Sequence, residues 1–285
     1  MILQITNLYK SYRSKEALQD INLILTAGTY GLLGENGAGK STLMRILTTI
    51  DFPTKGTITF DGEDIIKLDE NYREMIGYMP QDYTVYPSFT AQNFLEYMGV
   101  LKGIPKEELD KKIPEVLAFV NLSEVANKKV KSFSGGMKRR LGIAQAIIND
   151  PKILILDEPT SGLDAKERIR FSNIISAMSK DKIVILSTHI MSDIEAISNH
   201  LIIINKGQLI EATEIENLVE KVKGKVWEVV IDQEQFNLLS KERNVIRRKQ
   251  EGENIRVRYV GEPYEGLENQ SLEPTLEDYY VSVCL

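Results

Sequence analysis

The stretch 34-GENGAGKST-42 places three glycines within six positions and follows them with a lysine and two hydroxyl residues. It reads G-x-x-x-x-G-K-S from Gly34 to Ser41. Residues 29–33 before it suit a buried strand, and Leu43, Ile46, Leu47 and Ile50 after it have the spacing of an amphipathic helix. Between a strand and a helix, such glycines let backbone N–H groups point at phosphate oxygens, and the helix N-terminus adds partial positive charge. The stretch predicts a phosphate-binding loop.

Two side chains of this loop have predicted roles. Lys40 is expected to reach the β- and γ-phosphates of a nucleotide from a solvent-facing position, and the Ser41 hydroxyl to ligate Mg²⁺. The alternative is a glycine-rich turn with a chance lysine, which the flanking strand and helix disfavour.

A second motif, 152-KILILDEPTSGLD-164, follows in the second half of the chain. Its ILIL run suits a parallel strand that is buried on both faces, and two acids follow it. Asp157 would hold Mg²⁺ through water, and Glu158 would polarise the attacking water. The alternative is that the acids only mark where a buried strand meets solvent.

A third motif, 131-KSFSGGMKRRLGIAQAII-148, lies between the other two. Ser134, Gly135 and Gly136 precede apolar residues at helical spacing, so they are expected at a helix N-terminus, which can bind an anion. Because this second anion site is far from the phosphate loop in sequence, it indicates a dimer in which each subunit completes the other's nucleotide site.

Composition limits the class of protein. The 285 residues are 42% hydrophobic and 27% charged, as in ordinary globular proteins. The longest apolar run found is VLAFV, 116–120, too short to span a membrane, and the N-terminus lacks the pattern of a secretory signal. The single cysteine, Cys284, fits a reducing cytoplasm, and the net charge of −6 argues against a nucleic-acid partner.

On these ordered motifs, the chain resembles the ATP-binding subunit of an ABC transporter over about residues 1–215. The resemblance implies binding and hydrolysis of ATP with Mg²⁺. It places the family's signature loop on Ser134 to Met137, its magnesium acid on Asp157 and its catalytic glutamate on Glu158. It implies further nucleotide or metal contacts from the following residues: Tyr12, Gly34, Asn36, Gly37, Ala38, Gly39, Lys40, Ser41, Thr42, Gln81, Ser134, Gly135, Gly136, Asp164 and His189.

Four of these residues have distinct implied roles. Tyr12 would stack on adenine, and Gln81 would contact Mg²⁺ and water. Asp164 would reach across the dimer interface, and His189 would sense the γ-phosphate. Without the family, Tyr12 could equally be a core aromatic, Gln81 a solvated turn residue and His189 a loop or cap histidine. Arg13 and Tyr9 are the alternatives for Tyr12 in register.

The signature loop departs from the family pattern at one position. Met137 stands where the family usually has glutamine, so the serine hydroxyl and glycine amides are present but a polar side chain is lost. Weaker nucleotide-induced closure is expected, not inactivity.

The expected fold is α/β: a P-loop NTPase with a mixed central sheet, an N-terminal antiparallel β layer, an inserted helical subdomain at about 82–150 and a small α+β C-terminal domain. The ATP-binding domain is expected over residues 1–215 and the accessory domain over 216–285. Within the helical subdomain, the aromatics Tyr83, Tyr86, Phe89 and Phe94 are either contacts for a coupling helix of a membrane subunit or core residues. A basic cluster at 128–140 faces either lipid head groups or solvent.

The ATPase pattern stops near residue 215. A helix is expected at EIENLVEKVKG, strands at KVWEVVIDQ and IRVRYV, and a closing helix at EPTLEDYYVSVC. Leu272, Glu273 and Glu277 match an L-E-x-x-x-E tail that is common on exporter ATPase subunits, which favours export over import.

The resemblance therefore implies an ATPase subunit that forms a homodimer or heterodimer, binds an integral membrane permease and lies on the cytoplasmic face of the membrane. The alternatives are a soluble ABC ATPase of DNA repair, translation or cluster assembly, and a protein that binds ATP without hydrolysis. The chain lacks a long heptad insertion and a second phosphate loop, which argues against repair and translation; Glu158 argues against binding alone.

Overall fold

The computed structural model describes residues 1–13 and 15–284. The chain divides into two compact units, Met1–Ala212 and Thr213–Leu285. The division falls within strand β10 (Gln208–Glu214). In the described residues the first unit contains two sheets and the second contains one, and each unit is described separately.

A six-stranded sheet forms the centre of the first unit. Its strands lie in the order β10-β9-β3-β8-β7-β6, and the pairs β9–β3, β3–β8, β8–β7 and β7–β6 are parallel. The five parallel strands are β3 (Gly28–Leu33), β6 (Ile76–Met79), β7 (Ile153–Leu156), β8 (Ile183–Ser187) and β9 (His200–Asn205). Every residue of β7 and β8 is buried, which confirms the predicted strand covered on both faces.

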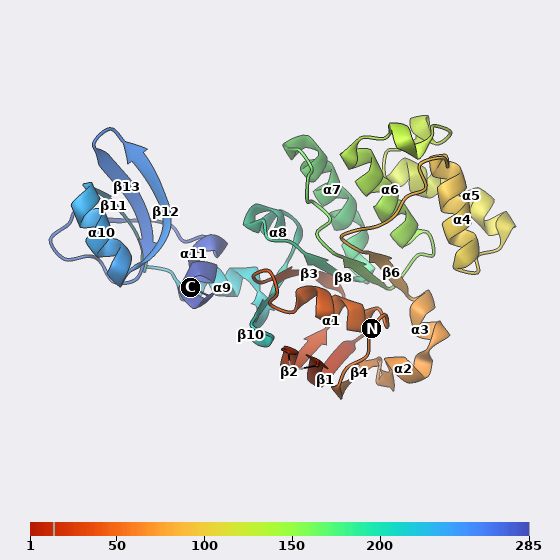
Figure 1. Cartoon of the computed structure of the whole chain (residues 1–285), viewed down its shortest axis with the longest axis horizontal. Coiled ribbons are helices and arrows are strands. Elements are labelled where there is room, and N and C mark those ends of the chain that lie inside the picture. The colour runs from red at the N-terminus through yellow and green to blue at the C-terminus, as the bar shows by residue number, and fades with distance from the viewer. Residues whose placement is uncertain (14, 285) are drawn as a thin grey trace. The chain divides into compact units, whose positions relative to one another are not determined.

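An antiparallel sheet forms a second layer of this unit. Its strands are β1 (Leu3–Tyr12), β2 (Lys15–Leu25), β4 (Lys55–Phe60) and β5 (Glu63–Asp64), in the order β2-β1-β4-β5. Helix α1 (Lys40–Leu47) lies between the two sheets (Figure 1). Apolar residues of both sheets and of α1 form one buried core. The predicted mixed central sheet and antiparallel β layer are confirmed.

Helix α1 is shorter than its apolar spacing predicts. The helix ends at Leu47, and Ile50 is exposed. Thr49 has a φ of 56°, and the N–H groups of Ile50 and Asp51 both donate to the carbonyl of Arg45. The chain therefore turns back at Thr49, and the prediction that Ile50 continues the buried face was wrong. Two short helices, α2 (Ile65–Leu68) and α3 (Glu70–Glu74), follow β5.

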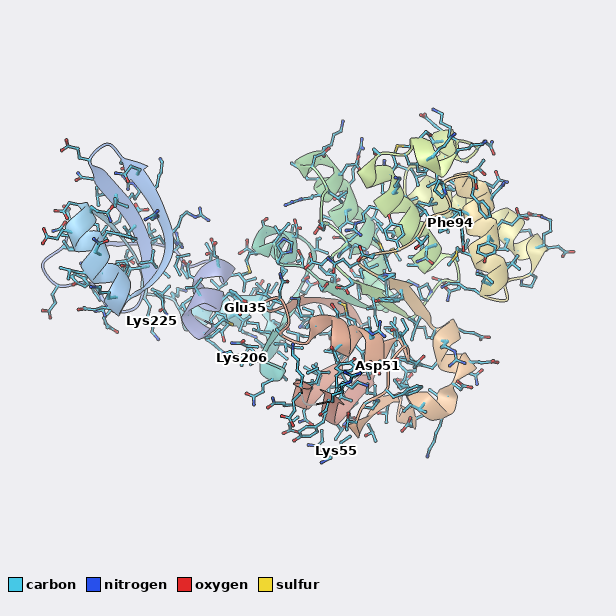
Figure 2. The ribbon with its side chains drawn as sticks, viewed as in Figure 1. Glu35, Asp51, Lys55, Phe94, Lys206 and Lys225 are labelled. Atoms are coloured by element: carbon cyan, nitrogen blue, oxygen red, sulfur yellow. The ribbon has the colours of Figure 1, made fainter. Side chains whose placement is uncertain are left out.

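Helices α4 (Ala91–Leu101), α5 (Lys106–Phe119) and α6 (Gly135–Ile147) gather on the other side of the central sheet (Figure 1). Two 3₁₀ turns, at Ser123–Val125 and Val130–Ser132, connect α5 to α6. Phe94 is buried among these helices (Figure 2). The same core includes residues of β7, β8 and α7 (Ala165–Met178). After α7, a turn at Ser179–Asp181 leads to β8, and α8 (Met191–Ile197) precedes β9.

The second unit is an α+β fold around an antiparallel sheet. Its strands lie in the order β12-β13-β11-β14: β11 (Val226–Ile231), β12 (Asn244–Glu251), β13 (Asn254–Val260) and β14 (Gln270–Ser271). Its helices are α9 (Ile215–Lys221), α10 (Gln233–Glu242) and α11 (Leu276–Cys284). Residues of β11, β13 and α10 form its core. The expected strands at β11 and β13 and the helices α9 and α11 are confirmed, whereas α10 and β12 were not predicted.

Candidate functional site

The loop between β3 and α1 brings backbone close to backbone. Gly34, Gly37 and Gly39 have φ values of 157°, 84° and 114°, a region that favours glycine. A Cβ on Gly34 would overlap the carbonyl oxygen of Ile204, and one on Gly39 would lie 2.7 Å from that of Ala17. The backbone conformation therefore favours glycine at all three positions of the opening stretch. At Gly34 and Gly39 the neighbouring backbone also leaves no room for a side chain.

Lys40 is buried, with 7% of its surface exposed, so the expected solvent-facing position was wrong. Its ammonium donates to the carbonyl oxygens of Gly34 at 2.6 Å and of Glu35 at 3.1 Å. The lysine thus folds back over the loop that it follows. Burial lowers the pKa of Lys40 below its usual value, and the carboxylates of Glu158 and Asp157 oppose this by raising it.

A cavity of about 320 Å³ opens over this loop. Its volume lies within the range of small-ligand sites. Eleven of the predicted site residues line it: Tyr12, Asn36, Gly37, Gly39, Lys40, Ser41, Thr42, Gln81, Asp157, Glu158 and His189. Gly34 and Ala38 are buried in the same loop and do not line the cavity. Three lining residues, Lys15, Ala17 and Ser161, were not predicted.

Asp157 and Glu158 follow β7 and are almost fully buried. The Ser187 hydroxyl at the end of β8 donates to Asp157 Oδ1 at 2.5 Å and accepts the Glu158 N–H at 2.8 Å. Glu158 itself has a φ of 49°. Ser187 was not predicted as part of the site, although β7 and β8 pair in parallel with Leu156 opposite Leu186, so that the next residues of the two strands meet. This serine fixes the Asp157 carboxylate against the backbone of Glu158.

His189 lies beside the second of these acids. Its Nδ1 is 3.0 Å from Glu158 Oε2, while most of its side chain is exposed. The structure thus brings the predicted histidine and glutamate together from the ends of two neighbouring strands. The carboxylate can orient the imidazole ring, and Glu158 Oε1 is left free of this contact.

Gln81 also lines the cavity, with its side chain on the surface. Its backbone carbonyl accepts a hydrogen bond from Arg139 Nη1 of α6 at 3.1 Å. The hydrogen bond to Gln81 therefore links the cavity to α6, the helix that Ser134 caps.

Tyr12 lies at the edge of the cavity, where Asp51 and Lys10 contact its side chain. Its hydroxyl donates to Asp51 Oδ2, Lys10 Nζ lies 4.7 Å from the ring centroid, and Lys10 is 2.5 Å from Asp51 Oδ1. Asp51 is labelled in Figure 2. Burial raises the pKa of Asp51, but hydrogen bonds from Lys10, Tyr12 and the Phe52 N–H outweigh it and hold the pKa at about 2. Tyr12 is 42% exposed, so it is not a core aromatic.

Ser134, Gly135, Gly136 and Asp164 do not line the phosphate-loop cavity. The Ser134 hydroxyl accepts the Met137 N–H at 3.2 Å and caps α6, which confirms its predicted helix N-terminus. Asp164 caps α7 by accepting the Glu167 N–H at 2.9 Å. Ser134, Gly135 and Asp164 are exposed. The structure thus splits the predicted nucleotide contacts into two separate regions of one chain.

Met137 has a packing role that the sequence did not reveal. Its partly buried side chain packs against the core of the helical subdomain. An apolar residue therefore suits this position in the chain. Its effect on closure stays a prediction.

The four aromatics after Gln81 divide between two roles. Phe94 is buried, and Tyr83 contacts α6, where a Cβ on Gly142 would lie 2.9 Å from its ring; burial raises the pKa of Tyr83 to about 12. Tyr86 is exposed, and its ring lies 5.0 Å from that of Phe89 and 5.5 Å from that of Tyr97. The core interpretation thus holds for Phe94 and for the half-buried Tyr83 and Phe89, which pack against the core. Phe89 also contacts the exposed Tyr86 and Tyr97 in an aromatic cluster.

The donor set of the cavity fits a magnesium ion. Ser41, Gln81 and Asp157 all line it, and each offers an oxygen atom. Mg²⁺ takes oxygen ligands and usually keeps several waters beside one or two protein groups. No cluster of three or more His, Cys, Asp or Glu residues suited to a metal occurs among residues 1–13 and 15–284.

Comparison with known proteins identifies the family. Residues 18–161 match the ABC transporter family. The chain belongs to this family. It is 39% identical over 227 residues to an uncharacterized ABC transporter ATP-binding protein of Bacillus subtilis (strain 168), covering 79% of this chain and 75% of the relative. It is 35% identical to the linearmycin resistance ATP-binding protein of the same organism, over 78% of this chain and 72% of the relative.

Other relatives and solved structures agree. The Nod factor export ATP-binding protein I of Cupriavidus metallidurans is 36% identical, over 78% of this chain and 74% of its own. The ATP-binding subunit of an ABC transporter matches with a TM-score of 0.69 and 25% identity, over 78% of this chain and 93% of its own. A dimeric ATP-binding cassette in a post-hydrolysis state with ADP and Pi matches with a TM-score of 0.67 and 26% identity, over 74% and 98%.

The chain is thus an ATP-binding subunit of an ABC transporter and an ATPase with the P-loop NTPase fold. In the part of the chain that the structure describes, no helix is long and apolar enough to cross a membrane.

Proposed function

We propose that the chain powers export by a nucleotide-driven dimer, in which each ATP lies between the phosphate loop of one subunit and the signature loop of the other. One observation carries the proposal. The residues expected around one nucleotide fall in two places in one chain: a cavity over Lys40, and the surface formed by Ser134, Gly135 and Asp164. A second subunit supplies the missing half.

The roles within the cavity follow from its contacts. Lys40 exchanges its two carbonyl partners for phosphate oxygens, and the loop N–H groups and the α1 N-terminus bind the same phosphates. Glu158 Oε1 accepts a hydrogen bond from the attacking water, while Oε2 stays on His189. Tyr12 offers its free ring face to the adenine.

Magnesium binding is also part of the proposal. Ser41 and Asp157 are the residues that would hold Mg²⁺, with Gln81 at the cavity edge. When bound, the ion neutralises charge on the phosphates. Ser187 keeps the Asp157 carboxylate in place for this purpose through its 2.5 Å hydrogen bond.

The transported cargo passes through a separate integral membrane permease, against whose cytoplasmic face the subunit lies. Export rests on the L-E-x-x-x-E tail at Leu272, Glu273 and Glu277 and on the names of two relatives, which concern Nod factor export and linearmycin resistance. The aromatic cluster of the exposed Tyr86 and Tyr97 with the half-buried Phe89 is the proposed permease contact. A soluble ABC ATPase is the competing function, and purification from membranes without any polytopic partner would favour it.

The test of the mechanism uses the two adjacent acids. Glu158→Gln keeps size and removes charge, so the variant is expected to bind MgATP, to hydrolyse it at least about a hundredfold more slowly and to run as a dimer on a sizing column. Asp157→Asn should instead weaken magnesium-dependent binding and give no trapped dimer. A Glu158→Gln protein that stays monomeric in saturating MgATP and hydrolyses at the parental rate would move the catalytic role elsewhere.

A further inference from the structure

Glu167 lies where the N-terminal ends of α6 and α7 meet. Its backbone N–H donates to Asp164 Oδ1 at 2.9 Å and so closes the cap of α7. Asp164 belongs to the loop that precedes α7, and Ser134–Gly136 form the loop at the start of α6. Neither loop lines the phosphate-loop cavity, and neither does Glu167.

The side chain of Glu167 lies directly against the signature loop. A Cβ on Gly136 would come within 2.9 Å of Glu167 Cγ and 3.0 Å of its Oε2. Real Cβ atoms essentially never make such close contacts, so a side chain at position 136 would displace Glu167. The absence of a side chain at Gly136 thus lets α7 pack closely on the start of α6.

Ion pairs of the Glu167 side chain also stabilise its contact with the start of α6. Glu167 Oε2 lies 3.3 Å from Arg140 Nε, one turn along α6 from Gly136, and Oε1 lies 2.5 Å from Arg170 Nη1 on α7. The Arg140 and Glu167 side chains are only 11% and 17% exposed. Arg140 Nε and Glu167 Oε2 are buried and make no aligned hydrogen bond, so electrostatic attraction is what joins them.

We propose that Glu167 is a positioning residue that joins the Ser134–Gly136 loop to the Asp164 loop, so that both approach the second subunit's nucleotide as one unit. Its backbone fixes Asp164, while its side chain fixes Gly136 and Arg140. The inference rests on the proposed composite site. It predicts a defect in turnover without a defect in the chain's own ATP binding.

The first test is Glu167→Gln in the full chain, with steady-state ATPase measurements. Loss of the charge removes the attraction between Glu167 and Arg140 and so loosens the joint between the two loops. We expect kcat to fall about tenfold, which is less than the roughly hundredfold cost that a 1 Å misplacement can carry. KM for ATP should stay within about twofold of the parental value. The matched control is Glu96→Gln, which removes an exposed ion pair to Lys106 at 2.8 Å and should change neither constant.

A double variant separates positioning from stability. Removing one partner of a buried ion pair is destabilising, whereas replacing both by apolar residues is often neutral. Arg140→Met with Glu167→Leu is therefore expected to melt within a few degrees of the parent, yet to keep the low kcat.

Two results would overturn the inference: a parental kcat in Glu167→Gln, or a double variant in which kcat recovers together with the melting temperature. A parental kcat in Glu167→Gln overturns the role of Glu167 whether or not the dimer forms, whereas a lowered kcat supports it only together with dimer formation. If Glu158→Gln alone stays monomeric with MgATP, the proposed function fails on that separate measurement. If it dimerises and Glu167→Gln matches the parent in both kcat and dimer formation, only the role of Glu167 is lost.

Discussion

The phosphate-loop cavity and the Ser134–Asp164 surface differ in how complete they are. In the cavity, residues from β1, the phosphate loop and the ends of β7 and β8 face one space of about 320 Å³. On the surface, Ser134, Gly135 and Asp164 are exposed and their side-chain contacts only cap helices. On the proposed function, the difference means that one chain holds the phosphate side of the site and presents the other side to a second subunit.

The largest expected effect belongs to the cavity. In Lys40→Ala, ATP binding should weaken on the order of a hundredfold or more, because two charge-assisted hydrogen bonds to phosphate are lost, each worth about 1.5–3 kcal/mol. Titration of the purified variant with ATP measures this. The matched control is Lys55→Ala, an exposed lysine on β4 that lies outside the cavity (Figure 2).

Near-parental ATP turnover in a folded Lys40→Ala protein would contradict the assignment of this cavity as a phosphate-binding site. The loop carbonyls of Gly34 and Glu35 also lose their partner in this variant. A circular dichroism spectrum equal to the parental one is therefore needed beside the binding measurement.

A smaller effect is expected at the edge of the cavity. Stacking of a base on an aromatic ring is worth about 1–3 kcal/mol, so Tyr12→Ala should raise KM for ATP by about tenfold. Tyr12→Phe keeps the ring but loses the Asp51 hydrogen bond, so a rise of only a few-fold is expected. Equal KM values for both variants and the parent would remove Tyr12 from the adenine site.

The smallest effect on ATP binding is expected in the helical region away from the cavity, where only stability should respond. Burial lowers the pKa of Lys102, at the end of α4, to about 8. Between pH 8 and the usual lysine pKa, the unfolded state binds more protons than the folded state, so the contribution of Lys102 to the free energy of unfolding rises with pH. Chemical denaturation measures this effect. The free energy of unfolding of the parent, minus that of Lys102→Met, should be larger at pH 10 than at pH 8.

Lys106→Met is the control for this pH effect, because the exposed Lys106 pairs with Glu96 and its pKa is raised, not lowered. No gain between pH 8 and pH 10 is expected for it. A gain of equal size in both comparisons would show that general charge, not burial at Lys102, sets the pH dependence. KM for ATP should be unchanged in both variants.

The sequence predicted the motifs more reliably than their surroundings. The strand–loop–helix at residues 28–47 and the buried β7 were predictable because glycine spacing and apolar runs are local signals. The burial of Lys40 was not, since it depends on loop carbonyls that the lysine reaches only after folding. Ser187 needed the parallel register of β7 and β8, which no local pattern contains.

The second unit also contains elements that were not predicted from the sequence. Strand β12 reads NVIRRKQE and has no buried residue, so it lacks the apolar alternation by which β13 was predicted. Helix α10 begins at a capping box of Asp232 and Gln235, which is a local signal for a helix N-terminus in the sequence. The Glu167 contact with Gly136 and Arg140 joins residues about thirty apart and was visible only in the fold.

The most direct test of the split site is Ser134→Arg in the Glu158→Gln background, measured by ATP titration and by sizing chromatography with MgATP. Ser134 lies outside the cavity, so the account predicts parental ATP affinity together with a monomer, where Glu158→Gln alone gives a dimer. A dimer as stable as that of Glu158→Gln, or a loss of ATP binding in the Ser134→Arg protein, would contradict the account.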